Sequence, residues 1–186
     1  MYKFAAAATN ESFVFGAARP GYTHQQVKAW IEFMQGQRIS RVCCLLPEPQ
    51  LDRYLDLLNV YRQYFGHDAI CWAPIADFEI VDREVLLHQI LPFLSLTDRQ
   101  SDRVVVHCAG GVGRTGQILA AWLIAGRGCP RELAIATVKQ SGRNPHEAAM
   151  AAPFMWRNPW RVMASINTLL DECSRIDLLD RSAIID

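Results

Sequence analysis

The sequence predicts one α/β domain, residues 1–186, with a central, mainly parallel twisted sheet and helices on both faces. Three observations predict it. Short apolar segments alternate along the chain with longer segments of helical periodicity. Those short segments are apolar throughout, which is typical of parallel strands buried on both faces. A length of 186 residues and a hydrophobic content of 51% are sufficient for one compact core.

The first predicted elements are a strand and a helix. Residues 12–15 are short and apolar, and the GAARPG stretch that follows, 16–21, is typical of a turn. Thr23 is suited to capping the N-terminus of a helix that ends near Gly36. The apolar residues of this helix recur at helical spacing: Val27, Trp30, Ile31 and Met34.

The middle of the chain predicts two strands and two helices. Residues 41–46 (RVCCLL) form a buried strand, and residues 51–65 form an amphipathic helix. Residues 69–73 form another buried strand. Residues 82–96 have helical spacing, with Pro92 expected to kink the helix.

The second half begins with a β-branched run at 104–106, which predicts a strand. Residues 115–125 are almost all apolar, so we expect a central helix there. Pro130 stands at a first-turn position and opens a helix that runs to about residue 140. A final helix spans 159–173.

The charge balance argues against some classes of partner. The chain has 19 Lys and Arg residues against 19 Asp and Glu, so a strongly basic nucleic-acid or membrane-surface binder is not expected. The apolar run at 2–8 is too short for a signal peptide, and no run reaches the roughly 20 residues of a membrane-spanning helix. We therefore expect a cytoplasmic protein without membrane insertion, whose oligomeric state the sequence leaves open.

Six cysteines are present, with no CxxC pair and no zinc-ligand spacing: Cys43, Cys44, Cys71, Cys108, Cys129 and Cys173. A chain of this length does not need disulfides, which fits a reducing compartment. The remaining histidines also lack ligand spacing: His24, His67, His88 and His146. We expect no metal and no cofactor.

The strongest local signal is HCAGGVGRTG at 107–116, placed between the predicted 104–106 strand and the apolar helix. Its glycines, Gly110, Gly111 and Gly113, allow the backbone N–H groups to converge. Such a loop before a helix N-terminus is an anion site, and Arg114 adds a planar set of donors for phosphate oxygens.

Cys108 is the first residue of this loop. Converging amides, the helix dipole and Arg114 should favour its thiolate, the nucleophilic form. A phosphate-binding loop has no need of a cysteine beneath the anion, but a thiolate there is placed for in-line attack on phosphorus. The GxxxxGK[ST] nucleotide-binding pattern is absent.

This segment resembles the signature loop of the cysteine-dependent protein tyrosine phosphatase superfamily. It contains His107 and Cys108, then five residues, then Arg114 and Thr115. The short chain and the GRTG ending are most similar to the compact dual-specificity phosphatases. The resemblance extends from about residue 13 to about residue 150 and is strongest in the loop.

The resemblance implies a role for each loop residue. Cys108 would attack phosphorus and form a phosphocysteine. Arg114 would bind the phosphate together with the amides of the loop residues Ala109, Gly110, Gly111, Val112 and Gly113. Thr115 would hydrogen-bond the sulfur and help it leave, and His107 would act indirectly, by orienting the loop and supporting the thiolate.

The family also uses a carboxylic acid that protonates the leaving oxygen and then activates water. Asp77 is the best candidate, because it follows the 69–73 strand and would lie at the same sheet edge as Cys108. Glu79 and Asp82 are the alternatives.

Other residues are weaker candidates. Arg143 and Asn144 would brace the loop or touch substrate, and Arg19 would rim the pocket. The loop interior, 109–113, has no lysine, which relatives acting on inositol headgroups tend to have. No counterpart of the water-positioning glutamine of classical tyrosine phosphatases is evident.

Two further expectations concern cysteines and aromatic residues. A reversible disulfide that protects oxidised Cys108 would use Cys43 or Cys44. Phe154, Trp156 and Trp160 are expected to pack the final helix onto the domain, whereas exposure there would indicate a partner.

The predicted function is metal-independent hydrolysis of phosphomonoesters on phosphorylated proteins or peptides, phosphotyrosine first and phosphoserine or phosphothreonine second. The first alternative is a phosphatase for a phosphoinositide, an inositol polyphosphate or an RNA 5′ phosphate. The second alternative is a silent phosphate-binding module.

Overall fold

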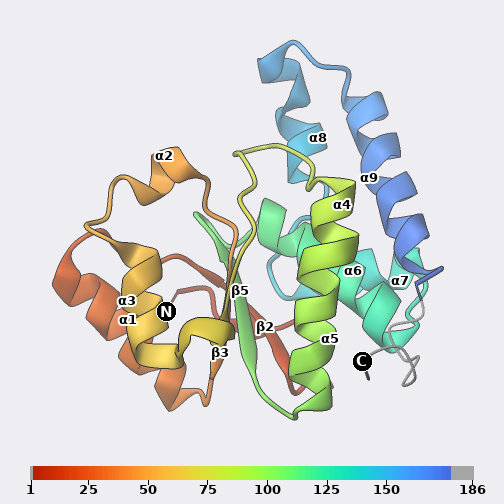
Figure 1. The fold of residues 1–186 in the computed structure, drawn as a ribbon. Coiled ribbons are helices and arrows are strands. Elements are labelled where there is room, and N and C mark those ends of the chain that lie inside the picture. Colours follow the sequence, from red (N-terminus) through yellow and green to blue (C-terminus); the bar gives the residue numbers. More distant parts are fainter. Residues whose placement is uncertain (1, 177–186) are drawn as a thin grey trace.

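The computed structural model describes residues 2–176 and contains a five-stranded sheet of order β1-β2-β5-β3-β4 (Figure 1). The strands are β1 (Ala5–Ala6), β2 (Val14–Ala18), β3 (Arg41–Cys44), β4 (Ile70–Trp72) and β5 (Val104–Cys108). All pairings are parallel except that of β1 with β2. Strand β5 lies in the centre, and all five of its residues are buried. The predicted α/β class with a mainly parallel sheet is confirmed.

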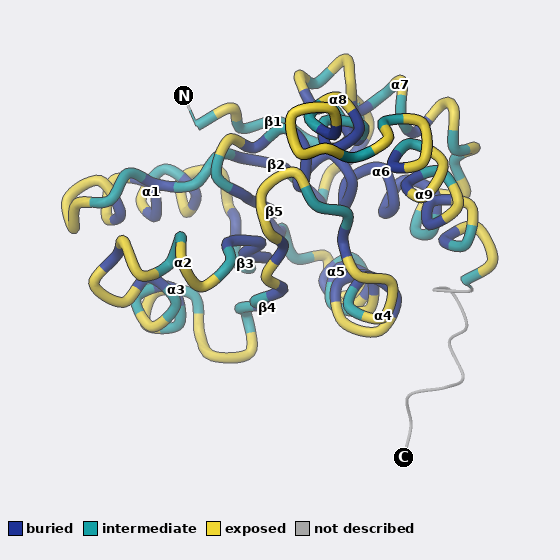
Figure 2. Tube along the Cα trace, turned by 90° about the horizontal axis from the view of Figure 1, so that it is seen from above, coloured by how far each residue is buried: buried dark blue, intermediate teal, exposed yellow. Residues whose placement is uncertain are grey.

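Helices cover both faces of the sheet (Figure 2). One face carries α1 (His24–Gly36) and α3 (Leu57–Phe65), whose core contains Trp30 and Tyr61. The other carries α6 (Gly113–Arg127), α7 (Arg131–Gln140) and α9 (Pro159–Cys173), together with the 83–99 helical segment. Every residue of α6 from 113 to 124 is buried, as expected for a central helix.

The expected turn at 16–21 is wrong in its first half, because β2 continues to Ala18. A Cβ at Gly16 would lie 2.8 Å from Leu119 Cδ1, so the small residues of this stretch let β2 pass close beneath α6. Pairing with β5 along the whole strand, from Val14 to Ala18, overrides the local turn composition.

The expected helix at 51–65 is divided. A short helix, α2 (Glu48–Leu51), is followed by bends before α3. The side chain of Asp56 accepts a hydrogen bond from the Asn59 N–H and caps α3, while Leu55 is fully exposed. A local cap therefore starts a new helix inside the amphipathic pattern.

The 82–96 segment forms α4 (Arg83–Val85), a π-helical segment η2 (Leu86–Ile90) and α5 (Leu91–Arg99). Pro92 does not end the helix. The Leu91 N–H donates to the Leu86 carbonyl across the wider π turn, and Pro92, which has no N–H, follows it.

Several short elements have too few residues for a periodic signal. They are β1, the 3₁₀ helices η1 (His67–Ala69) and η3 (Ala152–Met155), and α8 (Glu147–Ala151). The expected packing of Phe154, Trp156 and Trp160 onto the domain is wrong, because all three side chains are exposed. Within residues 2–176, no helix has the length and apolar character needed to cross a membrane.

Candidate active site

The cysteine of the signature loop ends the central strand and is 2% exposed. The Cys108 sulfur accepts hydrogen bonds from the Gly111 N–H and from the Thr115 hydroxyl, each at 3.2 Å. Both donors stabilise negative charge on sulfur. The loop then enters α6 at Gly113, so the helix N-terminus lies beside the sulfur.

Two loop glycines are required by the geometry. Gly111 has φ +68°, and a Cβ there would lie 2.6 Å from the Ala17 carbonyl group. A Cβ at Gly113 would lie 2.1 Å from Oε2 of Glu147, the first residue of α8. The loop thus packs against β2 on one side and against the Glu147 carboxylate on the other.

Arg114 joins this loop to the loop that follows β4. Its side chain is 4% exposed, donates to the Ile75 carbonyl at 2.8 Å and forms an ion pair with Asp77. Asp77 is 48% exposed at the side chain, so it lies at the entrance while Arg114 lies inside. Arg114 follows the same loop as Cys108 in the chain, and the fold places its guanidinium in direct contact with Asp77.

Gln50 of α2 was not anticipated from the sequence. Its Nε2 donates to Asp77 Oδ2 at 2.5 Å, and its Oε1 accepts from Arg114 at 3.3 Å. One amide therefore holds the carboxylate and the guanidinium together. No motif marks Gln50, because only the packing of α2 against the Asp77 loop gives it this role.

The alternative acids are engaged elsewhere. Glu79 pairs with Arg157 at 2.5 Å, and Asp82 accepts from the Val85 N–H as the cap of α4. Gln117 in α6 donates to the Glu79 carbonyl and accepts from the Val81 N–H, which fastens the end of this loop to α6. Of these three carboxylates, Asp77 is the one that contacts Arg114 of the signature loop.

His107 is completely buried on the face of β5 opposite Cys108, because successive strand residues alternate. Its Nε2 lies 3.3 Å from the Tyr61 hydroxyl, and its ring packs edge-on against Trp30. Burial lowers the pKa of His107 to about 3, so the imidazole is neutral at physiological pH.

Arg143 and Asn144 brace the loop region. Arg143 is 2% exposed and donates to the Lys3 carbonyl at 2.6 Å and the Gly16 carbonyl at 2.8 Å. The Asn144 N–H donates to the Val112 carbonyl at 3.3 Å. Burial lowers the pKa of Arg143. Arg143 and Asn144 were expected either to brace the signature loop or to touch substrate, and these contacts favour bracing.

Arg19 lies beside the start of the loop, and its N–H donates to the Cys108 carbonyl at 2.9 Å. Its guanidinium donates to the Tyr54 hydroxyl at 3.0 Å and lies 3.8 Å from the centre of the Tyr22 ring. The Arg53 guanidinium lies 4.0 Å from the same ring centre. The surroundings of Arg19 are therefore cationic and aromatic.

All six cysteines are free. Cys43 is directly opposite Cys71 in the sheet register, and the hydrogen bond with Cys71 raises the pKa of Cys43. Cys44 belongs to the core on the other face from Cys108. The thiol that Cys43 contacts is thus that of Cys71, which does not favour the expected pairing with Cys108.

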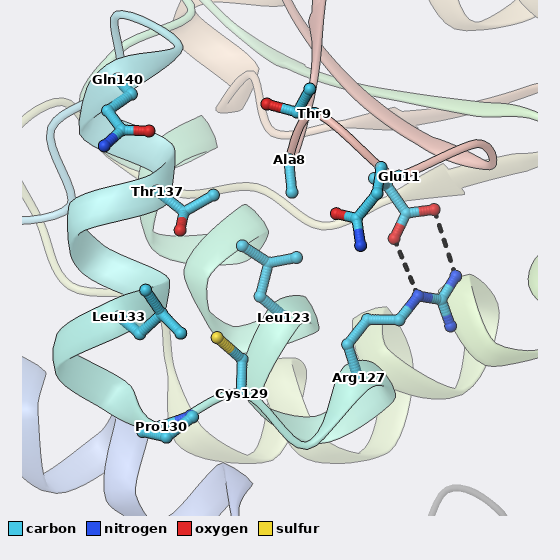
Figure 3. A pocket seen from close by; sticks show the side chains of 11 residues that line it. Ala8, Thr9, Glu11, Leu123, Arg127, Cys129, Pro130, Leu133, Thr137 and Gln140 are labelled. Carbon is cyan, nitrogen blue, oxygen red and sulfur yellow. Dashed lines mark hydrogen bonds and ion pairs between the residues drawn. The ribbon is translucent and has the colours of Figure 1, made fainter.

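A cavity of about 530 Å³ lies away from this site, at the far end of α6 (Figure 3). It lies between α7 and the 8–11 segment, and the ion pair of Glu11 with Arg127 is at one side. Both Glu11 oxygens are engaged by this pair and by neighbouring N–H groups. The cavity is therefore not part of the signature-loop site.

Comparisons with solved structures agree with this fold. Tk-PTP in its active form is 22% identical, with 89% of this chain and 93% of that chain covered and a TM-score of 0.65. PTPMT1 in complex with PI(5)P is 13% identical, with 92% and 97% covered and a TM-score of 0.68. A cysteine-to-serine variant of P. aeruginosa TpbA in complex with pTyr is 15% identical, with 89% and 88% covered and a TM-score of 0.54. At these identities the likeness shows the fold.

No curated protein sequence matches this chain. Residues 16–127, more than half of the chain, match the family model described as "Polymorphic toxin system, DSP-PTPase phosphatase". This range runs from β2 through the signature loop to the end of α6. The chain therefore belongs to this DSP-PTPase phosphatase family, within the cysteine-dependent protein tyrosine phosphatase superfamily that its signature loop resembles.

Proposed function

We propose that this phosphatase hydrolyses phosphotyrosine in proteins through a phosphocysteine intermediate and without a metal ion. The observation that carries the proposal is the assembly of a sulfur with two hydrogen-bond donors, a buried guanidinium and a half-exposed carboxylate around one loop. A module that only binds phosphate needs neither the sulfur nor the carboxylate. The silent-module alternative is therefore not retained.

In the first step the Cys108 sulfur attacks phosphorus and the bond to the leaving oxygen breaks. Asp77 gives its proton to that oxygen, so the alcohol or phenol leaves neutral. Arg114 uses its guanidinium donors and the loop uses its amides to hold the three equatorial oxygens. In this structure Asp77 accepts a hydrogen bond from Arg114. When the phosphate binds, it accepts from the Arg114 guanidinium in place of Asp77, and the acid is then free to act.

In the second step water attacks the phosphocysteine. Asp77, now a carboxylate, accepts a proton from that water, and the sulfur–phosphorus bond breaks to release inorganic phosphate. The Thr115 hydroxyl donates to the departing sulfur, as it does in this structure at 3.2 Å. The thiolate is thereby regenerated.

Two features support phosphotyrosine as the substrate. Aromatic side chains lie close to the site in the chain: Tyr22 packs against Arg19, whose backbone N–H donates to the Cys108 carbonyl, and the half-exposed Phe78 follows Asp77. The interior of the loop has no lysine for additional phosphates. TpbA, which has this fold, was solved with pTyr. A phosphoinositide is the second candidate, because PTPMT1, with the same fold, was solved with PI(5)P.

Steady-state kinetics on a phosphotyrosine peptide, a phosphothreonine peptide and PI(5)P, all with EDTA present, test the proposal. We expect the phosphotyrosine peptide to have the highest kcat/KM and EDTA to have no effect. Preference for PI(5)P by tenfold or more would assign the lipid as substrate instead. Loss of turnover in EDTA that returns with added metal would contradict the mechanism.

Three variants assign the roles. Cys108→Ser should abolish turnover, and Arg114→Lys should remain severely impaired because lysine lacks the planar pair of donors. Asp77→Asn should lower kcat on the phosphotyrosine peptide by about 10²-fold or more, with a smaller effect on p-nitrophenyl phosphate, whose leaving group needs less protonation. Wild-type rates for Asp77→Asn on the peptide would show that Asp77 is not the acid.

A further inference from the structure

Residues 150–161 form a hairpin that comprises the end of α8, the connection to α9 and the first turn of α9, and it exposes large apolar side chains. The exposed fractions are 66% for Met150, 89% for Phe154, 100% for Trp156 and 75% for Trp160. Soluble proteins rarely leave such side chains together in water without a partner. The hairpin projects from the same end of the molecule at which β5 ends with Cys108 (Figure 1).

An ordered backbone holds these side chains outward. Trp156 has φ +55°, which is uncommon for a residue other than glycine, and its N–H donates to the Pro153 carbonyl. The Arg157 N–H donates to the Ala152 carbonyl at 2.9 Å. Asn158 caps α9 by accepting from the N–H groups of the next turn. The exposure is therefore part of the folded geometry.

The charge pattern of the hairpin is one-sided. Between Glu147 and Asp171 the chain has only two charged residues, Arg157 and Arg161, and no carboxylate. Arg157 pairs with Glu79, whereas exposed Arg161 forms no ion pair with a carboxylate among residues 2–176. Tryptophan, phenylalanine and methionine beside arginine, without acids, are typical of segments that bind at an anionic lipid interface.

The hairpin is also tied to the catalytic entrance. The Arg157 ion pair reaches Glu79, two residues beyond Asp77, and the half-exposed Phe78 lies between these two acids in the chain. A partner surface that binds the hairpin would therefore lie next to the loop that contains Asp77.

We propose that the 150–161 hairpin docks the protein onto an anionic lipid bilayer. Phe154, Trp156 and Trp160 enter the interface between headgroups and acyl chains, and Arg161 pairs with lipid phosphates. A second copy of the chain fits less well, because Arg157 already pairs with Glu79 and the hairpin offers no carboxylate of its own to the Arg161 of a second hairpin. The docking is independent of which phosphomonoester is the substrate.

Co-sedimentation with phosphatidylcholine vesicles, with and without a quarter of phosphatidylglycerol, tests the docking. The full chain should bind the anionic vesicles and bind the neutral ones several-fold more weakly. The double variant Trp156→Ala/Trp160→Ala should bind at least about tenfold more weakly, because it removes two large interfacial side chains. Arg161→Gln should weaken binding to anionic vesicles about fivefold and leave binding to neutral ones unchanged.

Leu55→Ser is the matched control, since Leu55 is as exposed as Trp156 but lies before α3; its vesicle binding should equal that of the wild type. All variants should hydrolyse p-nitrophenyl phosphate at the wild-type rate. Brominated lipids should quench the fluorescence of the full chain and not that of the double variant.

Three results would overturn the docking. They are no binding of the full chain to anionic vesicles, equal binding by the double variant, and a dimer in light scattering that the double variant abolishes. The last result would identify the hairpin as a contact between copies. Because the vesicle assay needs no turnover, it can be repeated with Cys108→Ser, so failure of the proposed catalytic function would leave its result unchanged.

Discussion

At the scale of single residues, Gln50 contacts both Asp77, the proposed acid, and Arg114. Gln50→Ala removes both hydrogen bonds but leaves the ion pair of Asp77 with Arg114. We expect kcat/KM on a phosphotyrosine peptide to fall about five- to tenfold, as for the loss of one or two hydrogen bonds. Gln25→Ala, on the exposed face of α1, should have no effect. An unchanged kcat/KM for Gln50→Ala would show that the amide does not position these groups.

His107 makes stability depend on pH. Its pKa is near 6.5 in the unfolded chain and about 3 in the folded protein, because burial disfavours the charged form. Between these values the unfolded state binds more protons, so the free energy of unfolding rises with pH. Denaturant titrations should show a loss of about 1.6 kcal/mol from pH 6.5 to pH 5, at up to about 1.4 kcal/mol per pH unit.

Two variants isolate this effect. His107→Gln should flatten the pH dependence above pH 5, whatever its own stability. His24→Gln should retain the wild-type slope, because that side chain is exposed. A wild-type unfolding free energy that stays constant between pH 6.5 and pH 5 would contradict the burial argument.

Residues of the signature loop could be predicted because their chemistry depends on spacing within ten positions of the chain. Asp77 could be predicted because it follows a parallel strand, and such strands end at the same edge of the sheet. Gln50 and Glu147 could not be predicted. Each reaches the site from a short helix of five residues or fewer, and only tertiary packing determines where such a helix lies.

At the scale of elements, the cap of α3 determines where that helix begins. Asp56→Ala removes the acceptor for the Asn59 N–H and should lower the free energy of unfolding by about 1 kcal/mol. Asp52→Ala is the control, because that exposed carboxylate caps no helix N-terminus, and it should change stability by less than about 0.5 kcal/mol. Urea titrations measure both values, and equal effects would show that capping is not the cause.

The elements that were predicted correctly are long and periodic, or apolar throughout. Those that were wrong contain a competing interaction, which is a tertiary contact at Gly16 and a local helix cap at Asp56. The GAARPG stretch has turn composition, yet Gly16 is where β2 passes under α6. The 51–65 pattern is amphipathic, yet Asp56 divides it. The helix expected around Pro92 is present, and a π-helical segment, Leu86–Ile90, precedes the proline.

At the scale of the whole molecule, Glu11 connects the start of β2 to the end of α6. Its carboxylate is 1% exposed and accepts from Trp122 Nε1 at 3.0 Å and from two nitrogens of Arg127. Glu11→Gln should therefore cost roughly 3 kcal/mol of unfolding free energy. Asp98→Asn, which removes the more exposed partner of Arg127, should cost less than about 1 kcal/mol.

These two variants separate stability from catalysis. Glu11 lies near Val14, whose partner Val104 begins β5, whereas Cys108 ends it. Both variants should therefore hydrolyse p-nitrophenyl phosphate at the wild-type rate wherever they remain folded. A large loss of kcat in folded Glu11→Gln would indicate that this network influences the loop.

The proposed nucleophile, Cys108, is held more firmly by the fold than the proposed acid, Asp77. Cys108 ends the central strand, β5, which pairs with a strand on each side and leaves the sheet only when the whole domain unfolds. Asp77 stands on an exposed connection that a few polar contacts retain. Rising temperature or denaturant concentration should therefore abolish the measured hydrolysis rate in two stages. Turnover of esters that need proton donation disappears first, and cleavage of activated aryl esters persists until the sheet itself melts.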